Sequence, residues 1–400
     1  MTLEPTFVAD ALVNVFGAGG AMVVAREMER SDPKGQVSRR IAFALWFVAV
    51  FFVTRTWSWY TEGLLADALS DALASATPLV SLLVAEGLLR RHSPRWLKLA
   101  LLAGPVAVFG AKLLPFLPVQ LPVALLLATV LGGYAAIAGL LWRREAASLT
   151  SAENTSIRRL LLALLFLAPL IVTDFRSIWP DVPVRLGALG ALMLLYIGLG
   201  VGSFHASLRG RILNIVMFAA IAALFAGGYV ATGHADGGTD QLLRAAAVGV
   251  AGLLFAGIFS ESQGVRLERG RASVPLIDAT SPEDFLARLS AHALLGGAHM
   301  LPATVVDQVD APAFRSLLSS QRTLRRGAAP WGRAATDDGV ERALSLMTAY
   351  DATHLVLVTQ NPLRIIALSL PATAADARAE YEIDVVRLVG ERVYDKVAQP

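Results

Sequence analysis

The chain has 400 residues, of which 55% are hydrophobic and only 17% are charged, whereas soluble domains carry about 25% charged residues. A mean hydropathy of +0.56 excludes an ordinary soluble protein as a description of the whole chain. The net charge of +3 does not indicate a nucleic-acid partner, because the basic residues gather in short loops, where membrane topology accounts for them. The chain contains no cysteine, so disulfides, thiolate metal sites and cysteine nucleophiles are excluded.

Nine apolar stretches occupy the chain from Phe7 to Ser260. A helix needs about 20 apolar residues to cross a bilayer, and its backbone groups must be hydrogen-bonded within the segment. We therefore predict an α-helical polytopic membrane domain over residues 1–262, a juxtamembrane linker over 263–280 and a small cytoplasmic α+β domain over 281–400. The predicted spans are Phe7–Ala25, Ile41–Trp59, Leu64–Leu89, Leu97–Phe116, Leu121–Trp142, Leu160–Trp179, Leu186–Leu208, Ile212–Thr232 and Leu242–Ser260.

The first stretch is the least apolar, because it contains Asp10, Asn14 and a run of small residues. It either crosses the membrane or lies in the interface. Lysine and arginine concentrate in every second loop, over residues 26–40, 90–98, 143–159, 209–211 and 266–271. Cytoplasmic loops carry this excess, so the pattern predicts an external N-terminus and a cytoplasmic C-terminal domain.

Charged residues within the predicted spans gather toward the external ends. Arg55, Lys112, Asp174 and Arg176 belong to this group. A charge in a membrane segment costs about 2.5–3.5 kcal/mol on insertion scales, so such residues are usually paired, snorkelling or functional. Asp174 is a candidate to neutralise either Lys112 or Arg55.

Two interpretations of this polar group remain open. In the first, tryptophan and tyrosine mark the headgroup belt, and the long cations reach that belt by snorkelling. In the second, the group forms an outward-facing pocket in which Arg55, Lys112 and Arg176 attract an anionic or polar ligand between apolar walls formed by Trp57 and Trp179. Under both interpretations, we expect the membrane domain to contact membrane lipids.

Beyond Arg271 the hydrophobic runs shorten and acidic residues become common, which marks a domain boundary. Ser281 is predicted to cap a helix that ends near Gly296, and residues 303–309 are predicted to form a strand. A loop then carries a basic cluster with three interpretations: a solvated loop, a surface for anionic lipid headgroups or a site for a phosphorylated partner. The cluster comprises Arg322, Arg325, Arg326 and Arg333.

The end of the chain has the clearest pattern. A helix over residues 339–350 precedes apolar runs at 353–359 and 363–370, which flank the turn Gln360-Asn361-Pro362 and predict a β-hairpin. A final helix is predicted over residues 375–397. This order resembles the second half of GAF domains in bacterial membrane sensor proteins. Leu355-Val356-Leu357-Val358 and Arg364-Ile365-Ile366-Ala367-Leu368 take the strand places, and Asp384-Val385-Val386-Arg387-Leu388-Val389 takes the helix place.

The resemblance implies a bacterial inner-membrane sensory or scaffold protein that relays a signal to a cytoplasmic protein partner. The membrane region likewise resembles the multi-pass input modules of sensor histidine kinases. No kinase or cyclase motif is found, so neither catalysis nor a cofactor is expected. The final helix suggests a homodimer through Val386, Val389 and Val393, unless these residues belong to one broad face buried within the monomer. The alternative functions are a transporter or channel subunit with a regulatory domain and, third, a membrane-embedded lipid-modifying enzyme.

Overall fold

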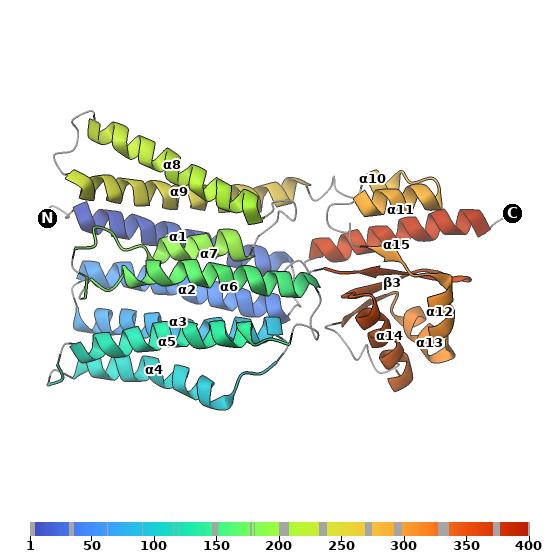
Figure 1. Cartoon of the computed structure of the whole chain (residues 1–400), viewed down its shortest axis with the longest axis horizontal. Helices are drawn as coiled ribbons and strands as arrows, with labels where there is room; N and C mark the ends of the chain where they lie inside the picture. The colour runs from blue at the N-terminus through green and yellow to red at the C-terminus, as the bar shows by residue number, and fades with distance from the viewer. Residues whose placement is uncertain are drawn as a thin grey trace. The chain divides into compact units, whose positions relative to one another are not determined.

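A computed structural model describes most of the chain and divides it into two compact units (Figure 1). Unit 1 comprises residues 1–144 and 157–265, and unit 2 comprises residues 145–156 and 266–400. Each unit is described by itself. The described residues are 5–31, 36–61, 63–89, 91–114, 116–118, 120–145, 151–176, 178–179, 181–199, 208–231, 238–268, 274–291, 298–326, 336–370 and 377–398.

Helices make up the regular structure that is described for unit 1. Within the described part of the chain, α1, α2, α3, α4, α5, α8 and α9 are long and apolar enough to cross a membrane. A helix rises 1.5 Å per residue, so the 26 residues of α3 extend about 39 Å. The helices are α1 (Pro5–Ser31), α2 (Gln36–Thr61), α3 (Leu64–Leu89), α4 (Arg95–Leu113), α5 (Gln120–Trp142), α6 (Ser151–Val172), α7 (Gly187–Leu194) with the π-helix η2 (Leu195–Leu199), α8 (Leu208–Ala231) and α9 (Gly238–Glu268).

Helix α1 belongs to the bundle. Its residues Val13 and Ala21 are fully buried, and they share a hydrophobic core with α2, α7, η2 and α9. Gly20 lies so close to Leu192 that a Cβ at position 20 would approach the leucine side chain to 2.5 Å. The small residues that lower the hydropathy of this segment thus permit close helix packing, and the packed position argues against an interfacial helix.

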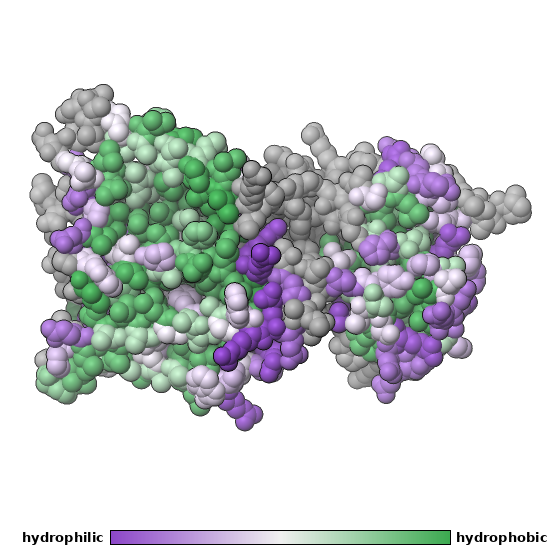
Figure 2. All heavy atoms as spheres, viewed as in Figure 1, coloured by the Kyte–Doolittle hydropathy of each residue, from purple (hydrophilic) through white to green (hydrophobic). Residues whose placement is uncertain are grey.

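The lateral surface of unit 1 is largely apolar, as the green areas of Figure 2 show. Large hydrophobic side chains on several helices face outward, among them Phe43, Val106, Leu165 and Phe225. A soluble domain rarely exposes apolar patches above a few hundred Å², and lipid is the solvent that such a surface fits. The fold of unit 1 is thus compatible with a multi-pass membrane domain.

Unit 2 contains an antiparallel sheet between two helical layers (Figure 1). The strand order is β1-β4-β3-β2, and β3 and β4 form the predicted hairpin. Because side chains alternate along a strand, Val356 and Val358 of β3 pack in one core with α10, α11 and α15, whereas Leu355 and Leu357 pack in the other core with α12, α13 and α14. The elements are α10 (Val274–Ile277), α11 (Pro282–Ala291), β1 (His299–Met300), α12 (Ala303–Val309), α13 (Pro312–Ser320), β2 (Thr323–Arg325), α14 (Asp337–Ala349), β3 (His354–Gln360), β4 (Leu363–Leu368) and α15 (Ala377–Ala398).

The predicted cap of α11 is found, with one change. The Ser281 hydroxyl accepts a hydrogen bond from the Asp284 amide at 3.1 Å, but the Asp284 carboxylate accepts from the Thr280 amide and not from that of Ser281. The predicted strand at residues 303–309 is wrong, because this segment is α12. The segment predicted as a linker is also partly structured, since α9 continues to Glu268 and Leu276 of α10 is fully buried.

Helix α15 confirms the predicted final helix but corrects the assignment of its dimer stripe. Val386, Val389 and Val393 are all buried in the core of unit 2, within one broad apolar face. Among the side chains of α15 that the structure describes, Tyr381 and Leu388 are exposed apolar residues. The three valines therefore pack within the monomer. Dimer formation stays a prediction, and its interface would have to lie on another surface.

Candidate functional site

A polar cavity of about 390 Å³ lies among α2, α3, α4, α5, α6 and α7 of unit 1. The charged part of its lining lies where α2, α4 and α6 end and where α3, α5 and α7 begin. The topology predicted from the loops makes this the external end of the bundle. Seven charged residues line the cavity: Arg55, Asp67, Asp71, Lys112, Asp174, Arg176 and Arg185.

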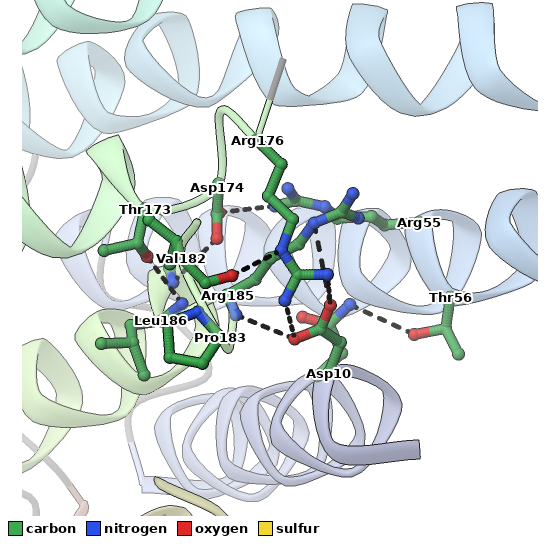
Figure 3. A network of polar contacts seen from close by, with 12 residues as sticks. Asp10, Arg55, Thr56, Thr173, Asp174, Arg176, Val182, Pro183, Arg185 and Leu186 are labelled. Atoms are coloured by element: carbon green, nitrogen blue, oxygen red, sulfur yellow. Dashed lines mark hydrogen bonds and ion pairs between the residues drawn. The ribbon is translucent and has the colours of Figure 1, made fainter. Parts of the chain in front are cut away.

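Arg55 and Asp174 form the most enclosed ion pair of the cavity lining that the structure describes. The Arg55 Nη1 lies 2.6 Å from Asp174 Oδ2, and both side chains are about seven-eighths buried. The other carboxylate oxygen of Asp174 accepts a hydrogen bond from the Gly187 amide at 3.1 Å. Asp174 thus joins α2 to the start of α7 (Figure 3).

Asp10 of α1 does not line the cavity itself, but it forms ion pairs with Arg176 and Arg185, two arginines of the lining (Figure 3). Its carboxylate, 3% exposed, lies 2.8 Å from Arg176 Nη1 and accepts a hydrogen bond from the Arg185 backbone amide at 2.8 Å. The Arg185 Nε is 3.8 Å away and is buried without a hydrogen-bond partner among the described residues. The Arg185 guanidinium instead stacks 4.2 Å from the centre of the Trp59 ring, a favourable cation–π arrangement.

Lys112 pairs with Asp71 of α3, at 2.9 Å from Nζ to Oδ2. Of the two partners predicted for Asp174, the structure therefore favours Arg55 over this lysine. Asp67, one helical turn before Asp71, completes this side of the lining. It makes no ion pair with any residue that the structure describes.

The two tryptophans assigned to the pocket walls do not line the cavity. Trp57 is 53% exposed and lines a separate apolar groove, and Trp179 is 42% exposed. The reason is helical geometry: Trp57 is two residues from Arg55, about 200° around α2, whereas Trp59 is four residues away and lies on the same face. Trp59 and Phe51 take the wall positions instead.

The deep part of the cavity is mostly apolar and ends at two side chains with hydroxyl groups. Leu126, Val130 and Leu167 line it, with Thr77 and Tyr134 at the greatest depth along α3 and α5. Thr77 is 13 residues beyond the start of α3 at Leu64, a depth of about 20 Å at 1.5 Å per residue. The cavity thus combines a charged mouth with an apolar interior that reaches the middle of α3.

Sequence reasoning brought together Arg55, Lys112, Asp174 and Arg176 correctly but assigned no role to Asp10 or Arg185. Signals for both were present. Asp10 is an acidic residue within an apolar stretch, and Arg185 is the one clear basic residue of the loops predicted to be external. A charged residue in an otherwise apolar membrane domain needs a partner of opposite charge. In the structure, Asp10 and Arg185 are such partners.

The basic cluster of unit 2 is only partly a loop. Arg325 belongs to strand β2, and Arg322 forms an ion pair of 3.1 Å with Glu391 of α15. The Arg326 guanidinium donates a hydrogen bond of 3.3 Å to Thr348. Arg333 lies outside the described residues. Contact with lipid or a partner stays a prediction for this cluster.

Fold and site together define a multi-pass helical membrane protein with a charged cavity and a small α/β/α domain. No protein-family model, curated protein or solved structure matches the chain.

Proposed function

We propose that this protein is a bacterial inner-membrane sensory protein, in which the polar cavity receives an external ligand and the C-terminal, GAF-like domain passes the signal to a cytoplasmic protein partner. The proposal assigns no catalytic step to the chain. Its main support is that the charged side chains at the cavity mouth come from separate segments, so a ligand that contacts them changes how those segments are held together.

A route from the cavity toward the C-terminal domain follows packed side chains. Asp10 ties the arginines of the cavity to α1. Further along α1, Phe16 packs against Phe255 of α9, with ring centres 5.8 Å apart. Helix α9 then continues to Glu268, into the residues of unit 2. A relay along this route predicts energetic coupling between the cavity and α15.

Hydrogen exchange of the full-length protein in lipid nanodiscs measures this coupling. Arg55→Met removes a cation from the cavity, and Arg95→Met removes an exposed one from the opposite end of α4 as the matched control. We expect Arg55→Met to change amide exchange in α15 and β3, with the helical circular dichroism signal preserved as a sign of folding. Equal exchange in α15 for the two variants would contradict a relay.

A transporter is the second candidate, because the cavity reaches the middle of α3, and transporters bind substrate near the bilayer midplane. It predicts accumulation of ligand in proteoliposomes. A receptor predicts saturable binding at one ligand per chain without accumulation.

A further inference from the structure

The charges around the cavity fall into two groups of opposite net charge. The arginine cluster comprises three cations, Arg55, Arg176 and Arg185, and two carboxylates, Asp10 and Asp174, so its formal charge is +1. The aspartate cluster comprises Lys112, Asp67 and Asp71, so its formal charge is −1. A ligand that satisfies both clusters carries one charge of each sign.

Each cluster has bonding capacity left among the described residues. In the arginine cluster, three guanidinium groups share two carboxylates, and Arg176 and Arg185 share the single carboxylate of Asp10. In the aspartate cluster, Asp67 has no ion pair with a described residue, and Lys112 donates a hydrogen bond to Oδ2 of Asp71. Guanidinium groups recognise carboxylate and phosphate oxygens, and a carboxylate without an ion-pair partner favours a nearby ammonium group.

The interior selects for an apolar group. Leu126, Val130 and Leu167 offer no charge or hydrogen bond to a ligand, and beyond them lie Tyr134 and Thr77, whose hydroxyl already donates to the Ala74 carbonyl. The volume of about 390 Å³ falls at the small end of ligand pockets, which span about 300–1,000 Å³. An apolar substituent that enters this region gains the usual free energy of burial. A small polar molecule without one leaves the deep part unfilled.

We propose that the polar cavity binds a zwitterion with an apolar substituent, its anionic group on the arginine cluster, its ammonium group on the aspartate cluster and its apolar part among the deep leucine and valine side chains. The inference rests on the proposed function and specifies the ligand class. The same chemistry occurs in a free amino acid with an apolar side chain and in the head region of an amino-containing lipid. An anionic ligand alone leaves Asp67 without a partner, which makes the zwitterion the better fit.

Isothermal titration calorimetry on the full-length protein in detergent tests the ligand class with matched probes. L-Leucine carries both charges, 4-methylpentanoate lacks the ammonium group and 3-methylbutylamine lacks the carboxylate. Lysophosphatidylethanolamine presents the zwitterion on a lipid, and lysophosphatidylglycerol is its anionic counterpart. We expect a zwitterionic probe to bind at least about ten-fold more tightly than its singly charged counterpart. Binding of leucine indicates a free ligand, and binding of the lysolipid alone indicates a lipid-borne one.

Asp67→Asn supplies the decisive variant, because Asp67 has no ion pair among the described residues and its loss should leave the fold intact. We expect about ten-fold weaker binding of the zwitterionic probe and unchanged binding of the anionic counterpart. Asp240→Asn, at the exposed start of α9, is the matched control and should bind normally.

The inference is overturned if 4-methylpentanoate or lysophosphatidylglycerol binds as tightly as its zwitterionic counterpart, or if neither zwitterion binds. It fails equally if Asp67→Asn binds like the Asp240→Asn control. Zwitterion binding that leaves amide exchange in α15 unchanged would uphold the ligand class and contradict the relay. If Arg55→Met changes amide exchange in α15 but no zwitterion binds, the relay is supported and the proposed ligand class is contradicted.

Discussion

Arg55 and Asp174 form a largely buried ion pair, and either charge without its partner would destabilise the fold. Removing one member of a buried pair leaves an uncompensated charge, whereas removing both does not. We expect Arg55→Met to lower the free energy of unfolding by about 3 kcal/mol, and Arg55→Met with Asp174→Asn to lower it by less. In the native protein, Asp174 Oδ1 accepts a hydrogen bond from the Gly187 amide. Asparagine at position 174 keeps an oxygen that can accept this bond.

Unfolding of the purified full-length protein in SDS titrations measures this cycle. The Arg342–Asp338 pair of unit 2, with side chains 37% and 55% exposed, is the control, and Arg342→Met should cost under about 1 kcal/mol. Additive losses for the Arg55 and Asp174 substitutions would show that the two side chains do not interact.

His354 of β3 is buried in unit 2, beside the Thr353 hydroxyl at 2.8 Å from Nδ1. Burial, assisted by the nearby Arg325 charge, lowers the pKa of this imidazole from 6.5 to about 3. Between these two pH values the unfolded chain binds a proton that the folded chain does not. Stability is therefore highest above pH 6.5 and falls as the pH drops toward 3, by about 1.4 kcal/mol per pH unit.

Amide exchange of β3 and β4 in the full-length protein, corrected for intrinsic rates, detects this loss. Lowering the pH from 7 to 5.5 should reduce the opening free energy of the sheet by about 1.4 kcal/mol. His354→Gln should remove most of this dependence. An identical pH dependence in His354→Gln would assign it to other groups.

At the scale of the elements, helix α5 packs against α3 through Gly133. A Cβ at position 133 would lie 2.5 Å from Cβ of Pro78, which belongs to a rigid ring within α3. Gly133→Ala should therefore lower stability by about 1–3 kcal/mol. Gly132→Ala adds a methyl group where no atom lies within 4 Å, so it should leave stability unchanged or raise it by up to about 1 kcal/mol, because alanine favours the helix. Thermal unfolding of the two variants in detergent makes the comparison, and equal losses would contradict this packing.

The sequence predicted most elements because each has a strong local signal. Apolar length identified the bundle helices, and the apolar hairpin with its turn identified β3 and β4. Helix α12 was mistaken for a strand because Val305, Val306 and Val309 favour strands by residue type. Their spacing of three and four residues is helical, and Pro302 at the N-cap fits a helix start.

The site was predicted in part, for a similar reason. Depth along each span follows from residue counting, which placed Arg55, Lys112, Asp174 and Arg176 at one level. Pairing depends on the rotation of each helix and on which helices are neighbours, and hydropathy carries neither. Asp71 rather than Asp174 therefore neutralises Lys112, and Trp59 rather than Trp57 stacks on the cavity arginine.

For the whole molecule, the account depends on the orientation of the bundle. Basic residues gather in the loops at one end, and the polar cavity lies at the other. The positive-inside rule therefore predicts that the cavity is external, where a ligand outside the cell could reach it. Since the chain contains no cysteine, a single introduced cysteine reports the side on which it lies.

Labelling with a membrane-impermeant maleimide in intact cells is the most direct test of this claim. Asp67→Cys, in the cavity lining, should react without permeabilisation, and Arg143→Cys, exposed after α5 at the basic end, should react only after it. Reaction of Arg143→Cys in intact cells, with Asp67→Cys labelled only after permeabilisation, would place the cavity on the cytoplasmic side and contradict an external receptor site.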